Sequence, residues 1–168
     1  MIVWIVGLAG AGKTTLASEI TNQVRQKGKK IVFIDGDNIR QIFGSDVDHS
    51  LEGRRKNAQR ICSICHMLDE QGINVICAIL SVFEESRNWN RRNFSKYFEV
   101  YIKTSLETLK SRDQKGLYSG FMNGEITNVV GLDLEFEEPK YPNLIIYNNK
   151  NLDNLLLYTE KICNLFCD

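Results

Sequence analysis

The sequence lacks an excess of charge of either sign, a long apolar run, and more than two prolines. Lysine and arginine together number 21, as do aspartate and glutamate, so no overall positive charge favours a nucleic-acid partner. No stretch approaches the ~20 apolar residues that span a bilayer, which argues against a helical membrane protein. With no repeat or low-complexity tract, the 168 residues are expected to form a single domain, residues 1–168, with a full core.

The cysteines do not suit a disulfide framework. Their number, five, is odd, and the apolar start is too short and lacks the basic residues of an export signal, so we expect a reducing, cytoplasmic environment. Cys62, Cys65 and His66 have a spacing found in zinc sites. However, Cys65 lies in an apolar helical stripe, and a closed structural site needs four ligands. Cys163 and Cys167 are expected to pack within the last helix.

Apolar runs of strand length alternate with helical patterns. The runs occupy residues 1–6, 30–34, 73–80, 98–103 and 143–148. They are continuous, as in parallel strands that are buried on both faces. One helical stripe ends at Gly28, a second ends at Gly72, and a third covers residues 152–166. Strands that alternate with helices predict an α/β fold with right-handed crossovers.

Residues 113–142 interrupt this alternation. They contain both prolines and four glycines, Gly116, Gly120, Gly124 and Gly131. A segment this long and glycine-rich within a compact domain is usually a lid or a binding loop, so we expect it to cover a ligand.

Residues 7–14 read GLAGAGKT and match the phosphate-loop pattern G-x-x-x-x-G-K-[ST]. The pattern follows the first apolar run and precedes the first helical stripe, as the motif requires. Backbone N–H groups of such a loop cradle phosphate oxygens at the positive end of the helix. Lys13 is therefore expected to reach the β- and γ-phosphates of ATP, and Thr14 to bind Mg²⁺. The predicted ATP-binding residues of the loop are Gly7, Leu8, Ala9, Gly10, Ala11, Gly12, Lys13, Thr14 and Thr15.

Three classes of protein are compatible with this loop: a small-molecule kinase, a GTPase-type switch, and a non-catalytic nucleotide-binding regulatory domain. A GTPase reads guanine with N-K-x-D, but the nearest string, residues 149–152, has Leu152 in place of the aspartate. The switch is therefore disfavoured. A regulatory domain would be favoured by the loss of a catalytic base.

Residues 35–40 read DGDNIR and follow the second apolar run. Carboxylates at the carboxyl edge of a parallel sheet lie beside the crevice where ligands bind. One carboxylate can orient or deprotonate an attacking hydroxyl, and another can hold metal-bound water. A simple Asp-Gly turn is the structural alternative.

Together with these motifs, RRKNAQR (54–60), RDQKGLY (112–118) and GEITNVVGLDLEFEEP (124–139) resemble the adenylylsulfate (APS) kinases over nearly the whole chain. The resemblance implies a P-loop kinase fold, with a five-stranded parallel sheet flanked by helices and a lid over residues 113–130. It also implies transfer of the γ-phosphoryl group of ATP, with Mg²⁺, to a nucleotide 3′-hydroxyl. The expected partner is a small-molecule nucleotide, without nucleic acid or membrane, and a homodimer stays open.

The resemblance further implies roles for individual residues. Asp37 matches the family's catalytic aspartate and would act with Lys13. Lys115 matches a lid lysine at the reacting phosphates, and Arg112 an arginine near the ATP adenine. Ser81 matches a serine considered as a phosphoserine intermediate, but direct in-line transfer needs no such intermediate. The expected substrate-binding residues are Asp35, Arg40, His49, Arg54, Asn57, Leu80, Ser81, Lys115 and Val129.

The chain departs from the family in the base pocket. In APS kinases two phenylalanines enclose the substrate adenine, whereas His49 and Val129 occupy those positions here. The family's serine-proline-tyrosine-arginine run reads SVFE at residues 81–84, which is expected to remove a kink and reverses a charge. Catalytic residues retained beside an altered base pocket predict a different nucleotide acceptor. This profile resembles that of relatives that phosphorylate cytidine diphosphoramidate in bacterial capsule phosphoramidate biosynthesis, so we expect that acceptor, with APS as the alternative.

Overall fold

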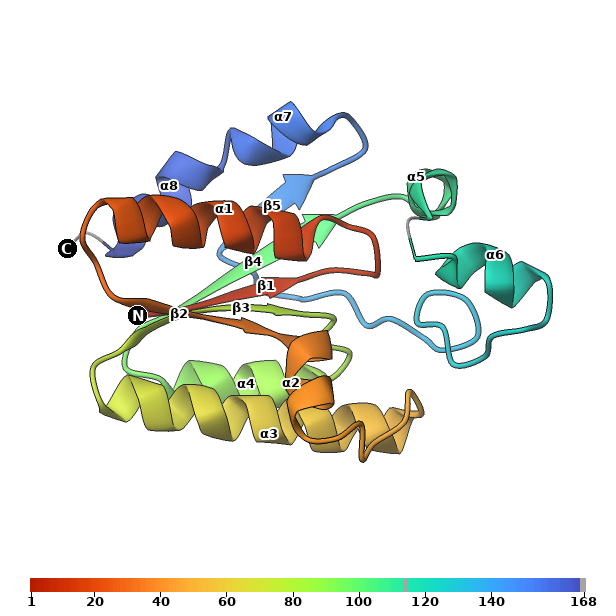
Figure 1. Ribbon diagram of the computed structural model, residues 1–168, viewed down its shortest axis with the longest axis horizontal. Helices are drawn as coiled ribbons and strands as arrows, with labels where there is room; N and C mark the ends of the chain where they lie inside the picture. The colour runs from red at the N-terminus through yellow and green to blue at the C-terminus, as the bar shows by residue number, and fades with distance from the viewer. Residues whose placement is uncertain (114, 167–168) are drawn as a thin grey trace.

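The computed structural model describes residues 1–113 and 115–166, so Cys167 lies outside the described residues. Five parallel strands form one sheet in the order β2-β3-β1-β4-β5 (Figure 1). The strands are β1 (Ile2–Val6), β2 (Ile31–Asp35), β3 (Asn74–Ile79), β4 (Tyr97–Lys103) and β5 (Leu144–Tyr147). They coincide with the five apolar runs within two residues, which confirms the predicted α/β fold and its five-stranded parallel sheet.

Helices cover both faces of this sheet (Figure 1). The helices are α1 (Lys13–Gln26), α2 (Gly36–Ile42), α3 (Leu51–Glu70), α4 (Glu84–Asn93), α5 (Leu106–Arg112), α6 (Leu117–Met122), α7 (Leu152–Leu156) and α8 (Thr159–Cys163), followed by a 3₁₀ turn at Asn164–Phe166. Helices α1, α7 and α8 lie on one face, and α3 and α4 lie on the other.

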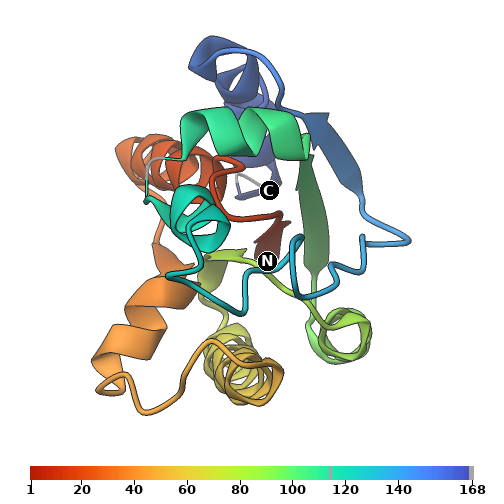
Figure 2. The same cartoon turned by 90° about the vertical axis from the view of Figure 1, so that its right-hand side faces the viewer.

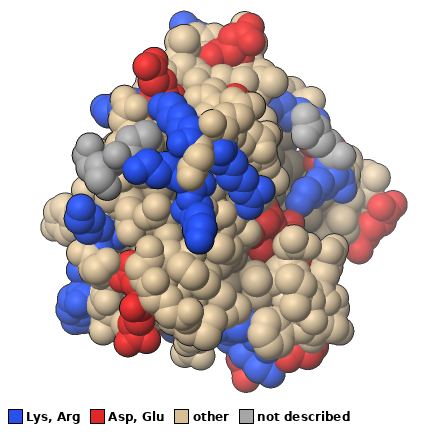
Figure 3. Space-filling view, turned by 60° about the vertical axis from the view of Figure 1, so that its left-hand side comes forward, with Lys and Arg blue, Asp and Glu red and all other residues tan. Residues whose placement is uncertain are grey.

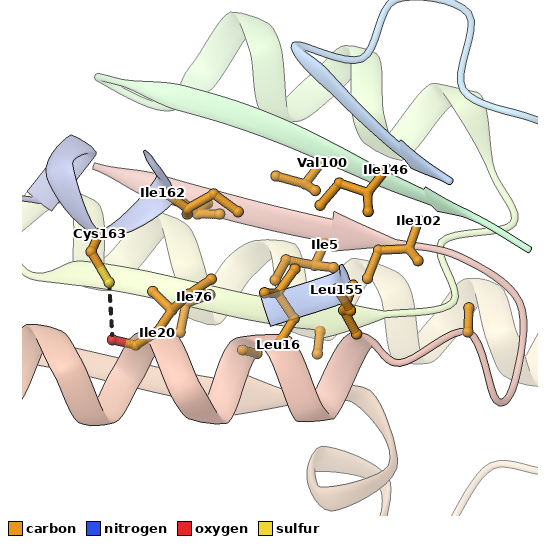
Figure 4. Close-up of a cluster of buried hydrophobic side chains, with 14 of the residues drawn as sticks. Ile5, Leu16, Ile20, Ile76, Val100, Ile102, Ile146, Leu155, Ile162 and Cys163 are labelled. Carbon is orange, nitrogen blue, oxygen red and sulfur yellow. Dashed lines mark hydrogen bonds between the residues drawn. The ribbon is translucent and has the colours of Figure 1, made fainter. Parts of the chain in front are cut away.

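Alternation along the central strand builds two cores. Val3 and Ile5 of β1 belong to a cluster on the α1 side, and Trp4 belongs to a cluster on the α3 side. Figure 4 shows the first cluster, in which isoleucines of the sheet face Leu16 and Ile20 of α1, and the Cys163 thiol lies 3.8 Å from the Ile20 carbonyl oxygen. Complete burial of each such side chain contributes about 1.5–3 kcal/mol.

The two predicted helix ends are confirmed, whereas the C-terminal stripe is not one helix. Gly28 and Gly72 have φ of 75° and 70°, the left-handed conformation expected just after a helix. The stripe over residues 152–166 is divided into α7, α8 and a 3₁₀ turn. Several of its apolar positions are still buried, as at Leu155 and Ile162, whereas Leu152 at its start is 53% exposed.

Residues 113–142 are more structured than a simple loop. They include α6 and an isolated bridge between Val130 and Leu134. Figure 2 looks onto the carboxyl edge of the sheet and shows α5 and α6 in front of it. The segment thus covers the edge at which a parallel sheet binds ligands.

The surface charge is uneven although the net charge is zero. Figure 3 shows lysine and arginine side chains gathered on one face of the molecule. The end of α1 contributes exposed Arg25, and the turn between α1 and β2 contributes exposed Lys27, Lys29 and Lys30. Within the described residues, no helix has both the length and the apolar character needed to span a bilayer.

Candidate active site

The phosphate loop joins β1 to α1 and has the backbone that its glycines predict. Gly10 and Gly12 have φ of 77° and 97°, which other residues adopt only with strain. A Cβ on Gly7 would lie 2.7 Å from the Ile102 carbonyl oxygen, so glycine is also required for close packing on β4. The loop leads into the amino end of α1, where free N–H groups and the helix dipole favour an anion.

Lys13 is the first residue of α1, and its ammonium group is held inside the loop. Its Nζ donates a hydrogen bond of 2.8 Å to the carbonyl oxygen of Leu8. Burial lowers the pKa of Lys13 to about 8, against the opposing charges of Asp37 and Asp35. The Lys13 ammonium is therefore charged at neutral pH and loses its proton above about pH 8.

This pKa predicts a pH dependence of ATP binding. The triphosphate favours the charged ammonium, so binding raises the pKa of Lys13 and takes up a proton. We expect the Kd for ATP to be constant below pH 8 and to rise above it by up to about tenfold per pH unit. Calorimetry between pH 6.5 and 9.5 measures this, with Lys13→Arg as the control whose charge does not titrate. Equal pH profiles for the two proteins would contradict the assignment.

Two oxygen ligands suited to a hard cation meet at the mouth of this loop. The Thr14 hydroxyl donates to Asp35 Oδ2 over 2.8 Å. Asp35 ends β2 and caps α2, since its Oδ1 accepts from the Asp37 backbone N–H at 2.9 Å. This bond places Asp37 in the first turn of α2, a helix that the sequence interpretation did not identify.

Asp37 is paired with the lysine from the segment above it. Lys115 Nζ lies 2.7 Å from Asp37 Oδ2. Burial acts to raise the pKa of Asp37, but the hydrogen bond and charge of Lys115, together with Lys13 and His49, lower it overall. Asp37 is therefore a carboxylate at neutral pH, able to accept a proton or a hydroxyl hydrogen bond.

A second contact holds α6 against the phosphate loop. The Tyr118 hydroxyl donates to the Ala9 carbonyl oxygen over 2.9 Å. Asp113 caps the start of α6 by accepting from the backbone N–H groups of Tyr118 and Ser119 at 2.9 and 2.8 Å. Figure 2 shows α6 beside the loop that follows β1. The segment thus contacts both the phosphate loop and Asp37.

Two cavities adjoin at Asp37. One has a volume of about 170 Å³ and is lined by the phosphate loop, Asp35, Asp37 and Lys115. The other has a volume of about 50 Å³, and the residues that line it are Gly36, Asp37, Arg40, Arg54, Asn57, Ala58, Ile79, Leu80, Ser81, Val82 and Phe83. We call them the phosphate cavity and the acceptor cavity. They share Gly36, Asp37, Arg54, Ile79 and Leu80, so groups bound in the two would meet beside Asp37.

Several predicted substrate residues are brought together in the acceptor cavity. Arg40 donates to the carbonyl oxygens of Val47 and Asp48 at 2.8 and 2.6 Å. Asn57 Nδ2 donates to the Gly36 carbonyl oxygen at 3.1 Å, and its buried Oδ1 has no hydrogen-bond partner in the described residues. An unsatisfied buried acceptor is costly unless a ligand donates to it.

Ser81 has a strained backbone that two residues missed by the sequence interpretation support. Its φ of 50° lies in the left-handed region, which a residue other than glycine rarely adopts. The Ser81 hydroxyl accepts from the Trp4 indole at 3.3 Å, and its carbonyl accepts from Arg87 at 2.6 Å. Arg87 is fully buried. An arginine four residues into a polar segment gave no sequence signal of this role.

Apart from Gly7, Leu8 and Ala11 of the phosphate loop, three predicted residues lie outside both cavities. Val129 is 1% exposed and packs in the core, so it offers no surface to a base in this conformation. His49 lies near Asp37 and two arginines, Arg40 and Arg54. Its pKa is lowered, mainly by burial and also by the positive charges of the two arginines. Arg112 donates to the Lys150 carbonyl oxygen at 2.6 Å, which ties the end of α5 to the loop after β5. Their binding roles stay predictions.

Comparison with known proteins places this geometry in a family. The family model described as adenylylsulphate kinase matches residues 1–147. A cytidine diphosphoramidate kinase of Campylobacter jejuni subsp. jejuni is 38% identical over 154 residues, which cover 92% of this chain and 89% of the relative. An adenylyl-sulfate kinase of Bacillus licheniformis is 36% identical over 166 residues, covering 95% of this chain and 84% of the relative.

A solved structure agrees over nearly the full length. The APS kinase of Mycobacterium tuberculosis, in complex with AMPPNP and APS, superposes with a TM-score of 0.89 and 29% identity, covering 99% of this chain and 97% of that chain. These likenesses agree with the features of the site, namely the phosphate loop and the pairing of Asp37 with Lys115. The chain belongs to the adenylylsulphate kinase family.

Proposed function

We propose that this kinase transfers the γ-phosphoryl group of ATP to the 3′-hydroxyl of cytidine diphosphoramidate. The main support for this reaction is that the phosphate cavity and the acceptor cavity meet at Asp37. A phosphoryl donor on one side and a hydroxyl acceptor on the other would face each other there. Phosphoryl transfer depends mainly on such positioning and on electrostatic stabilisation.

The donor side of the site is formed by the phosphate loop. Backbone N–H groups and Lys13 would hold the phosphates, and Lys13 must give up its bond to the Leu8 carbonyl to reach them. The Thr14 hydroxyl and the Asp35 carboxylate fit Mg²⁺, which prefers oxygen ligands and would neutralise phosphate charge when bound. Arg112 is proposed to lie near the adenine.

Asp37 would act on the acceptor. Its carboxylate would accept a hydrogen bond from the 3′-hydroxyl and take its proton as the new P–O bond forms. Lys115 contacts the same carboxylate, and its ammonium group would stabilise the negative charge of the transferring phosphoryl group. We propose that residues 113–130 form a lid that keeps water from this point, with Gln114 outside the described residues.

The residue changes at the two positions that contact the base in APS kinases support a cytidine nucleotide. A stacked base is worth about 1–3 kcal/mol per aromatic face, and buried Val129 supplies no such face. His49 can stack on a smaller pyrimidine and hydrogen-bond to its edge. Arg40 and Arg54 would bind the charged phosphates of the acceptor. The Campylobacter relative, a cytidine diphosphoramidate kinase, supports the same assignment. We further propose that the enzyme acts in capsule phosphoramidate biosynthesis in the cytoplasm.

A panel of acceptors tests this assignment. With ATP and Mg²⁺, we expect cytidine diphosphoramidate to give a higher kcat/KM than APS, CDP or ADP, with phosphorus NMR showing the new 3′-phosphate. An advantage of APS over every cytidine compound by tenfold or more, about 1.4 kcal/mol in transition-state binding, would contradict the cytidine assignment and support APS kinase activity. No turnover with any acceptor would favour a regulatory domain.

A further inference from the structure

Asp133 lies in a tight loop next to Val129 and organises its backbone. Its two carboxylate oxygens accept from consecutive backbone N–H groups, Asn128 at 2.7 Å and Val129 at 2.6 Å. The loop is closed by backbone bonds from Leu132 to Val129 at 3.0 Å and from Gly131 to Leu134 at 2.7 Å. Two adjacent N–H groups on one carboxylate fix the direction of the peptide between them.

Asn128 takes a backbone conformation that needs this support. Its φ is 62°, in the left-handed region that residues other than glycine adopt less readily. In this conformation the Asn128 carbonyl oxygen points at Arg54 and accepts from its Nη2 at 2.8 Å. Asp133 thus fixes an acceptor for Arg54, 74 residues away in sequence.

Arg54 is held on a second side by the loop that carries His49. Its Nε donates to the His49 carbonyl oxygen at 2.8 Å. Two backbone carbonyls therefore fix the plane of the guanidinium group, while its Nη1 has no hydrogen-bond partner among residues 1–113 and 115–166. Arg54 lines both the phosphate cavity and the acceptor cavity, so its free Nη1 is available to a bound phosphate.

We propose that Asp133 is a positioning residue for the acceptor nucleotide: it lines neither cavity, but through the Asn128 turn it holds Arg54 with Nη1 available to the acceptor phosphates. The assignment rests on the proposed kinase function only for the identity of the acceptor. Through Asn128, Asp133 connects the loop beside Val129 to Arg54, which lines both cavities. Although Arg54 also lines the phosphate cavity, we expect ATP to be held mainly by the phosphate loop, so its affinity should depend less on this link than that of the acceptor.

The test uses Asp133→Asn, with Glu135→Gln as the matched control two residues away. We expect Asp133→Asn to raise the KM for the acceptor about tenfold, with the Kd for ATP unchanged, because one N–H loses its carboxylate partner. The effect should be absent when Arg54 is already replaced: Arg54→Ala and the double variant should have equal KM values. Additive effects, or an equal loss of ATP affinity, would overturn the proposal.

A second readout needs no turnover. The Arg54 Nε–H signal in proton–nitrogen NMR spectra, assigned with Arg54→Lys, should shift and broaden in Asp133→Asn but not in Glu135→Gln. An unchanged signal would reject the positioning role, whereas a wild type that phosphorylates no nucleotide would reject only the proposed function. If Asp133→Asn does not fold, both readouts are taken in an Asn128→Gly background, where glycine adopts φ of 62° without strain.

Discussion

Replacing Asp37 with asparagine is expected to lower kcat by about 10²–10⁴-fold, the usual contribution of a positioned general base. Asparagine keeps the shape of the side chain but cannot take a proton from the acceptor hydroxyl. Because Asp37 lies where the two cavities meet, rather than in the phosphate loop, the Kd for ATP should stay within about twofold. Steady-state kinetics and calorimetry measure the two quantities.

The matched control is Asp46→Asn. Asp46 is an aspartate of the same region, paired with Arg60 at 2.9 Å, and it lines neither cavity. Its loss should leave kcat unchanged. Near-full turnover of Asp37→Asn would remove Asp37 from the mechanism and would favour a non-catalytic, nucleotide-binding role for the chain.

Replacing Lys115 with methionine should lower kcat by about 10²–10³-fold, as removal of one preorganised charge at a transition state does. Methionine keeps much of the length of the side chain and removes the charge that meets Asp37 at 2.7 Å. The pKa of Asp37 should also rise, because Lys115 is the main group that lowers it against burial. The acid limb of the kcat profile should therefore move to higher pH.

Lys110→Met is the control for this change, since Lys110 is an exposed lysine in the last turn of α5 and lines neither cavity. It should retain wild-type kcat. If Lys115→Met instead raised the KM for the acceptor with kcat preserved, Lys115 would contribute only to binding of the ground state, and its proposed place at the reacting phosphoryl group would be wrong.

Features that depend on neighbouring residues were predictable from the sequence. The phosphate loop, the five strands and the helix ends at Gly28 and Gly72 each follow from a local pattern, and the structure has them where the pattern places them. The sequence also indicated that the carboxylates of residues 35–40 lie beside the crevice where ligands bind. In the structure, the 2.8 Å bond from Thr14 brings Asp35 to the phosphate loop.

Features that depend on distant residues were not predictable. The Trp4–Ser81 bond joins residues 77 positions apart, and the bonds from Arg87 and Arg54 reach Glu137 and Asn128 over 50 and 74 positions. No periodicity signals such pairs, since each side chain alone resembles an ordinary core or surface residue. Val129 shows the same limit. The motif predicted a base-contacting role for this position, but only the fold shows that its side chain is buried.

The residues that the two cavities share are distinct from positions 49 and 129, and this separation has an evolutionary consequence. The two cavities are joined by Gly36, Asp37, Arg54, Ile79 and Leu80, whereas His49 and Val129 line neither. On the base-contacting roles proposed for positions 49 and 129, mutations there after a gene duplication would alter nucleobase selection without touching the residues that the two cavities share.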